Sequence, residues 1–97
     1  MPRKIVFRDK ALKEMNSAYW WYEEERNGLG DLFLENIDFA LTTLKANPQA
    51  YQEVYKKFRH IPLKKFPFVL LYKIYPLQIV IFAVFHTKRN PKKKYSK

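Results

Sequence analysis

The chain has 97 residues, which is enough for one domain with a modest hydrophobic core. It contains no cysteine, which excludes disulfides and thiolate zinc sites and makes a reducing compartment, the cytoplasm, the simpler expectation. Its 19 Lys and Arg and 9 Asp and Glu give a formal net charge of +10, and from Val54 onward there is no acidic residue. Such segregated charge indicates a polyanion or an acidic protein as partner.

A membrane partner is not expected. The apolar segment from Phe66 to Phe85 is interrupted by Pro67, Lys73 and Pro76, so it fits two strands and a turn better than one spanning helix. The N-terminal sequence MPRKIVFRDK has too short an apolar stretch for a signal peptide.

The N-terminal part predicts a strand followed by a helix. Ile5 and Phe7 alternate with more polar neighbours, as in a strand with one better-buried face. Asp9 is predicted as the N-cap of a helix that runs to about Arg26. The helix is expected to bury an apolar stripe spaced by three and four residues, with two alanines beside it: Ala11, Leu12, Met15, Ala18, Tyr19 and Tyr22.

A second helix is predicted after a turn at Asn27 and Gly28, where either residue tolerates the left-handed angles that end a helix. This helix is expected to stop before Pro48, which cannot continue it. Its apolar stripe comprises Leu29, Phe33, Ile37, Ala40, Leu41 and Leu44. The short turn predicts two antiparallel helices.

The C-terminal half predicts three strands of an antiparallel meander: Phe58–Lys64, Val69–Tyr75 and Ile79–His86. Pro62 places the first of these at a sheet edge, because proline cannot donate to a ladder. The seven apolar residues that precede His86 place the last strand centrally, with the N-terminal strand on its free side.

The predicted fold class is therefore α+β, with the order β-α-α-β-β-β and a helical hairpin packed on a four-stranded, mainly antiparallel sheet. Residues 1–97 are expected to form a single domain, with a loosely held basic tail from about Asn90.

Basic residues cluster in and after the predicted strands, and we expect them to converge on one rim of the sheet. There they could bind a phosphate backbone or acidic side chains. The alternative is a solvated surface that only confers solubility, although such surfaces usually mix both signs of charge. The candidate target-binding set is Arg59, Lys64, Lys65, Lys73, Lys88 and Arg89.

His86 and Arg89 could supply a base and a phosphate clamp for phosphodiester cleavage. The favoured alternative gives both residues structural roles. His86 would cap the strand by a hydrogen bond, and Arg89 would pair with a carboxylate of the first helix, such as that of Glu23, Glu24 or Glu25. The sequence has no glycine-rich phosphate loop, nucleophile elbow or metal-ligand spacing. We therefore expect no cofactor, no metal and no small-molecule substrate.

The aromatic block from Tyr19 to Tyr22 is wider than one helical stripe, so part of it must lie at the helix edge or be exposed. Tyr19 and Tyr22 are expected in the core. Trp20 and Trp21 either anchor a protein partner or wrap the edge of the core.

Four stretches together resemble the RelE/ParE superfamily of toxins from bacterial type II toxin-antitoxin modules, which includes plasmid stabilisation proteins: WWYEEERNGLG, IDFALTTLKANPQAY, KKFPFVLLY and VFHTKRNP. The resemblance runs from the first strand to Pro91. It implies two helices against an antiparallel sheet, and a toxin held inactive by an acidic antitoxin that wraps the domain. Trp20 and Trp21 are the candidate antitoxin contacts.

The superfamily contains RelE-like enzymes, which cut messenger RNA on the ribosome, and ParE-like toxins, which inhibit DNA gyrase without being enzymes. The basic positions of the RelE-like site fall here on His60, Pro62 and Val69, whereas the terminal arginine and tyrosine are matched by Arg89 and Tyr95. The resemblance therefore favours the ParE-like, non-enzymatic mode.

Two alternatives remain open. In the first, the chain is a ribonuclease whose candidate catalytic residues are His60, His86, Arg89 and Tyr95. In the second, it is a non-toxic basic nucleic-acid-binding module, which would explain the charge but not the helical hairpin with its aromatic block.

Overall fold

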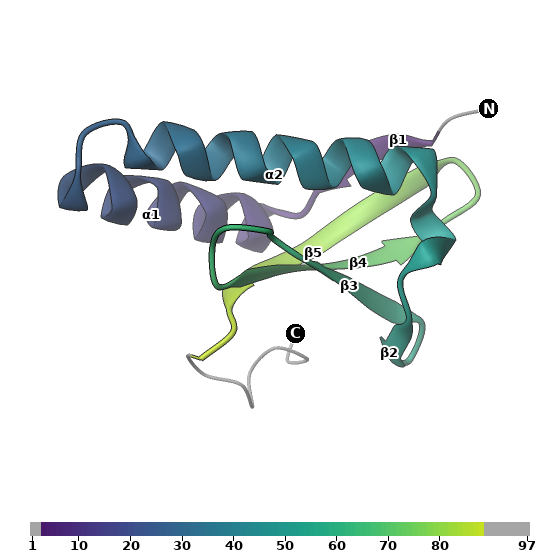
Figure 1. The fold of residues 1–97 in the computed structure, drawn as a ribbon. Coiled ribbons are helices and arrows are strands. Elements are labelled where there is room, and N and C mark those ends of the chain that lie inside the picture. The colour runs from purple at the N-terminus through teal and green to yellow at the C-terminus, as the bar shows by residue number, and fades with distance from the viewer. Residues whose placement is uncertain (1–2, 89–97) are drawn as a thin grey trace.

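The computed structural model describes residues 3–88, which form two long helices, a short 3-10 helix and five strands (Figure 1). In chain order these are β1 (Lys4–Phe7), α1 (Asp9–Glu25), α2 (Leu29–Ala46), η1 (Pro48–Ala50), β2 (Glu53–Tyr55), β3 (Phe58–Pro62), β4 (Phe68–Ile74) and β5 (Gln78–His86). Arg89, Tyr95 and the predicted basic tail lie outside the described residues.

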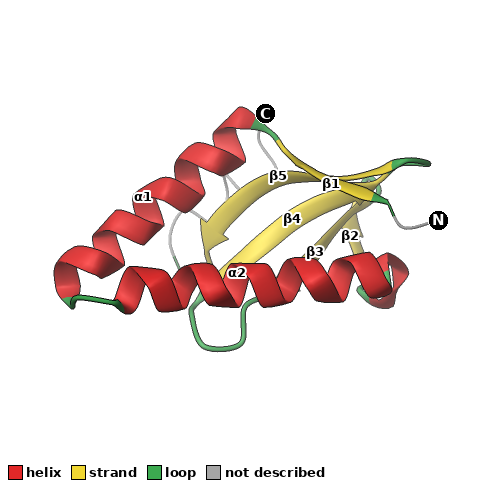
Figure 2. Cartoon of the chain, turned by 90° about the horizontal axis from the view of Figure 1, so that it is seen from above, coloured by secondary structure: helices red, strands yellow, loops and turns green. Residues whose placement is uncertain are grey.

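The strands form one sheet in the order β1-β5-β4-β3-β2, and the helical hairpin lies on one of its faces (Figure 2). β1 runs parallel to β5, whereas all other neighbours are antiparallel. The α+β class, the helical hairpin and the place of β1 beside the last strand are thus confirmed. The last strand lies inside the sheet as expected, although β4 is the middle strand.

The predicted count of four strands is wrong, because β2 adds a fifth at the edge. Lys56 and Lys57 adopt left-handed backbone angles, with φ of 45° and 73°, and these turn the chain back so that Tyr55 pairs with Phe58. Neither residue is glycine or asparagine, so the sequence carries no ordinary signal for this turn.

The prediction that the strand with Pro62 is an edge strand is wrong, because β2 lies outside β3. β2 pairs only with Phe58 and Arg59, so the rest of β3 is not covered by it. The Leu63 N–H donates to the Phe68 carbonyl at 2.9 Å on the β4 side. Because donors alternate along a strand, the donor that Pro62 lacks would have faced away from β4, where no ladder bond is lost.

The core fills the space between the hairpin and the sheet. Four aromatic rings, those of Tyr22, Phe33, Phe66 and Phe68, pack with centroid separations of 4.8 to 6.1 Å. Such offset and edge-to-face contacts are favourable beyond the area they bury. The two predicted stripes supply the helix side of this core, except that Leu12 is exposed.

The first helix begins one residue earlier than predicted. Asp9 is its first residue rather than its N-cap, which is Arg8 and makes no side-chain capping bond. The Asp9 carboxylate still lies in the first turn, where the positive end of the helix dipole favours it.

A β-bulge in β5 fixes which side chains face away from the helices. Leu71 pairs with Ala83 but Tyr72 pairs with Ile81, so Phe82 is the extra residue of β5. The Val84 N–H donates to Glu14 Oε1 of α1 at 2.8 Å. This hydrogen bond satisfies a backbone donor next to the bulge and ties α1 to β5.

Glu23 holds the turn between the helices by accepting the N–H groups of Gly28 and Gly30, each at 2.9 Å. Gly28 has a φ of +89°, the left-handed angle that favours glycine. Gly30 is required for a different reason, because a Cβ there would lie 2.6 Å from the Tyr19 carbonyl oxygen.

We predict that Gly30→Ala lowers the free energy of unfolding by about 1–3 kcal/mol, since the methyl group forces the two helices apart. Urea denaturation measures the change. Gly28→Asn is the matched control, because no atom lies within 4 Å of a Cβ at that position and asparagine tolerates left-handed angles. Equal stability of the two variants would show that the helices do not depend on this close approach.

Candidate functional site

The strand register sorts the predicted site residues between the two sheet faces. His60 pairs with Leu71 on the face opposite the helices, which we call the open face because the described residues place no helix on it (Figure 1). Arg59 pairs with the core residue Tyr72, and His86 pairs with the core residue Phe68. The two histidines therefore lie on opposite faces.

Arg59 is bound to the connector that follows α2. Its Nη1 donates to the Tyr51 carbonyl at 2.6 Å, and the neighbouring Tyr72 hydroxyl donates to the Pro48 carbonyl at 2.8 Å. Burial raises the pKa of Tyr72 to about 12, although the Arg59 charge acts in the opposite direction. Arg59 thus has a structural contact that occupies part of its guanidinium group.

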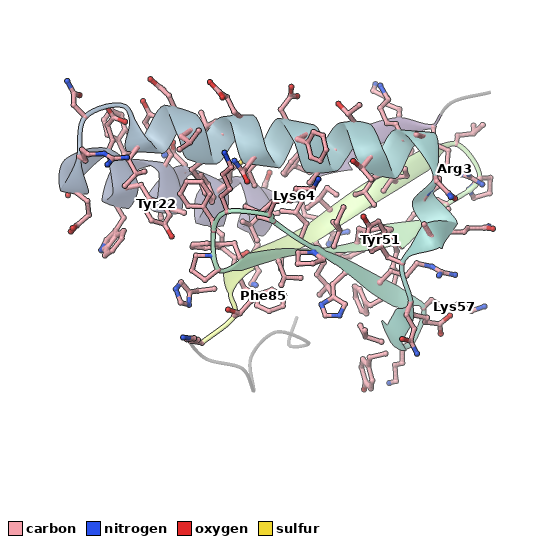
Figure 3. All side chains as sticks on the ribbon, viewed as in Figure 1. Arg3, Tyr22, Tyr51, Lys57, Lys64 and Phe85 are labelled. Carbon is pink, nitrogen blue, oxygen red and sulfur yellow. The ribbon has the colours of Figure 1, made fainter. Side chains whose placement is uncertain are left out.

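Lys64 and Lys65 lie in the loop between β3 and β4, which packs against α2 (Figure 3). The Lys64 ammonium is 4.6 Å from the centroid of the Phe39 ring, a cation–π contact. The Lys65 N–H donates to Asn36 Oδ1 at 3.1 Å. This part of the basic set therefore lies next to the helical layer.

Lys73 lies on the open face, with its ammonium 4.3 Å from the centroid of the Phe58 ring. Lys88 follows β5, and its N–H donates to His86 Nδ1 at 3.1 Å. The expected convergence on one rim is not observed for the described members of the set, because Lys64 and Lys65 contact the helical layer whereas Lys73 faces away from it.

His86 has the contacts expected of a histidine that caps a strand. Its Nδ1 accepts a backbone N–H, and its ring packs edge-to-face against Phe68 with centroids 5.2 Å apart. In residues 3–88 there is no group of three His, Cys, Asp or Glu residues that could hold a metal ion. Among residues 3–88, no helix is long and apolar enough to cross a membrane.

The aromatic block of α1 divides between core and surface. Tyr22 is buried and Tyr19 packs partly against the core, as expected. Trp20 and Trp21 remain 55% and 50% exposed, and each packs edge-on against its tyrosine neighbour. Two large aromatic side chains exposed next to each other are typical anchors of protein interfaces.

Residues 5–91 match the family model described as ParE toxin of the type II toxin-antitoxin system, parDE. The chain belongs to the ParE toxin family. A search of curated proteins finds no match.

Solved structures with a similar fold come from several bacterial toxin-antitoxin complexes. The chromosomal ParDE system of P. aeruginosa gives a TM-score of 0.73 at 17% identity, covering 89% of this chain and 97% of that chain. The intact RelBE complex of E. coli gives 0.68 at 17% identity, with 90% and 99% covered. The RelBE2 complex of M. tuberculosis gives 0.63 at 16% identity, with 89% and 99% covered.

Sequence reasoning missed several open-face residues of this ParE-family toxin that surround Lys73. Phe58 and Phe82 pack edge-to-face with centroids 5.1 Å apart, and the Arg8 guanidinium is 5.1 Å from the centroid of the Phe82 ring. A strict alternation in β3 and β4 could have indicated Phe58 beside Lys73. The bulge that places Phe82 had no sequence signal.

We predict that Arg59→Met lowers the free energy of unfolding by about 1–3 kcal/mol at neutral pH, because the Tyr51 carbonyl loses a charged donor. Lys64→Met, which loses only a surface cation–π contact, is the matched control and should lose less. Urea denaturation of both variants measures the difference. If they are equally stable, Arg59 is not held by the fold and is available to a partner.

We predict that Arg59→Met also changes how the stability of the protein depends on pH. Because the folded-state pKa of Tyr72 is about 12 and its ordinary value is 10.0, its contribution to stability is complete below about pH 10 and is lost as pH rises towards 12. Arg59 lowers this pKa, so Arg59→Met should move the upper end of the window to higher pH. An ultraviolet titration of tyrosine absorbance, with Tyr72→Phe to assign the signal, measures it.

Proposed function

We propose that this toxin arrests growth by binding DNA gyrase rather than by cutting RNA, and that an acidic antitoxin neutralises it in the cytoplasm. The observation that carries the non-enzymatic mode is the placement of the two histidines on opposite sheet faces. General acid-base cleavage needs its proton-transfer groups and its phosphate clamp around one scissile bond.

The residues at the RelE-like site positions support the same conclusion. Pro62 and Val69 pair with each other across β3 and β4, at positions where the RelE-like site carries basic groups. Val69 is 5% exposed, and neither side chain can bind phosphate. His60 alone supplies a titratable group among these three positions, which is a weak basis for catalysis.

The antitoxin is proposed to contact the outer surface of α1 through Trp20 and Trp21. Two adjacent tryptophans that are about half exposed give a large apolar contact area at little cost in side-chain entropy. The ParDE and RelBE neighbours were solved as toxin-antitoxin complexes, which supports a protein partner of this kind. The net charge of +10 favours an acidic one.

We predict that Trp20→Ala and Trp21→Ala each weaken binding of the antitoxin, encoded by the neighbouring gene, by about tenfold or more, as expected for aromatic anchors. Calorimetric titration with the purified antitoxin measures this. Leu77→Ala is the matched control, since Leu77 is 80% exposed on the β4–β5 turn and outside the proposed contact. Wild-type affinity in both tryptophan variants would remove this surface from the proposal.

The target is tested with wild type, Arg89→Ala and Tyr95→Phe in a gyrase supercoiling assay beside messenger RNA cleavage on translating ribosomes. We expect inhibited supercoiling and no cleavage by wild type, weaker inhibition or antitoxin binding by Arg89→Ala, and almost no effect of Tyr95→Phe. Ribosome-dependent cuts that both variants lose by about a hundredfold would instead establish the ribonuclease.

The remaining alternative, a basic nucleic-acid-binding module without toxicity, is tested by expression alone. Wild type should slow growth, and co-expression of the antitoxin should restore it. Unaffected growth together with no antitoxin complex would favour that alternative over a toxin.

A further inference from the structure

A row of aromatic and cationic side chains crosses the open face of the sheet. Its members come from or directly follow all five strands: Arg8, Phe82, Lys73, Phe58, Tyr55 and Lys56. We call this set the aromatic–cation row. Apart from Lys73 it contains no residue of the predicted target-binding set.

The register explains why these residues form a line. Tyr55 pairs with Phe58, and the β3–β4 register, continued by one residue, brings Phe58 opposite Lys73. Lys73 pairs with Val80 of β5, two residues before the bulged Phe82. The row therefore runs across the strands, with a shift of two residues between β4 and β5, and four inter-strand spacings give it a length of about 19 Å.

Each aromatic ring of the row is in contact with a cation. The Lys73 ammonium is 4.3 Å from the Phe58 centroid and 5.7 Å from that of Phe82. Arg8 is 5.1 Å from Phe82, and the Lys56 ammonium is 5.3 Å from the Tyr55 centroid. Such contacts hold the long side chains in place, so less side-chain entropy is lost when an anion binds.

These three cations are not neutralised by carboxylates in the described part of the chain. Within residues 3–88 the one ion pair joins Lys10 to Glu14 on α1. The nearest acidic strand residue is Glu53, which pairs with Arg59 in the β2–β3 register and accepts the Lys57 N–H at 3.0 Å. An anionic partner would therefore meet positive charge along the row.

The contacts of the rings in the row favour an acidic polypeptide over a nucleic acid, whereas the apolar strand residues beneath the rings are too buried to contact either. Val69, Leu71, Val80 and Ala83 are all buried outside the main core cluster, and Leu71 pairs with Ala83 on the open face. A nucleic acid would instead need free ring faces on which to stack its bases. Here cations already cover faces of the Phe58, Phe82 and Tyr55 rings.

We propose that the aromatic–cation row docks an extended acidic segment of the protein that the toxin inhibits. About six extended residues span its length, so that carboxylates on one side of the segment meet Arg8, Lys73 and Lys56. The inference rests on the proposed function, which supplies an inhibited protein, and it adds the surface and the chemistry of the contact. The row faces away from the helical layer that carries Trp20 and Trp21.

The test measures binding of a fluorescent octapeptide of alternating glutamate and leucine to the full-length toxin by anisotropy. We expect Lys73→Met and Phe82→Leu to weaken its binding about tenfold or more, and Arg8→Gln to weaken it in the same direction. The matched control is Lys45→Met, which removes the same charge from an exposed position on α2. The same peptide with glutamine in place of glutamate should bind about tenfold more weakly than the acidic one.

Urea denaturation of each variant shows whether it is folded. If Lys73→Met does not fold, the peptide affinity of Arg8→Gln is the test. Equal peptide affinity of the folded row variants and Lys45→Met would overturn the proposal. So would tighter binding of a single-stranded octanucleotide than of the acidic peptide, which would make the row a nucleic-acid surface.

Growth arrest separates this inference from the proposed function. Row variants that lose the peptide should also lose most of their growth inhibition while keeping antitoxin affinity. If they arrest growth like wild type, the row does not dock the inhibited protein and the proposed function stands. If wild type itself fails to arrest growth, the proposed function fails, and the peptide titration still tests the acidic-segment chemistry of the row.

Discussion

The hydrogen bond from the Val84 N–H to Glu14 is the contact on which the arrangement of both surfaces depends. It joins the helical layer to β5 at the one place where that strand departs from regular alternation. The bulge beside it lets Val84 return to the core while Phe82 and Ala83 remain on the open face. A hydrogen bond from a backbone donor to a carboxylate is stronger than one between neutral groups, so this contact helps to hold the irregular geometry.

The two layers give this small toxin two chemically different surfaces. The helical layer covers the aromatic core and leaves Trp20 and Trp21 exposed on its outer side. The open face carries cations held against phenylalanine and tyrosine rings. Among residues 3–88 the two histidines lie on opposite faces of the sheet, and both surfaces have the features of protein interfaces. Both surfaces therefore suit the binding mode that we propose for the toxin.

The regular elements could be predicted from the sequence because each has a strong periodic signal. Both helices follow from their apolar stripes, and β5 follows from its unbroken apolar run. β2 could not be predicted, because Lys56 and Lys57 form a turn that residues of this type seldom adopt. The positions of the site residues were harder to predict. The sheet face on which a side chain lies depends on the strand register and on the bulge in β5, and the bulge has no signal in the sequence. The sequence left open whether the two tryptophans are exposed, and the structure shows that both are. The roles of Arg89 and Tyr95 stay predictions.

The central claim is that the antitoxin and the inhibited protein use different layers of the toxin. Hydroxyl-radical footprinting, read by mass spectrometry on the toxin alone and bound to its antitoxin, tests it most directly. The account predicts that the antitoxin protects Trp20 and Trp21 from oxidation and leaves Phe58 and Phe82 as reactive as in the free toxin. Protection of the two phenylalanines with unchanged oxidation of both tryptophans would contradict it.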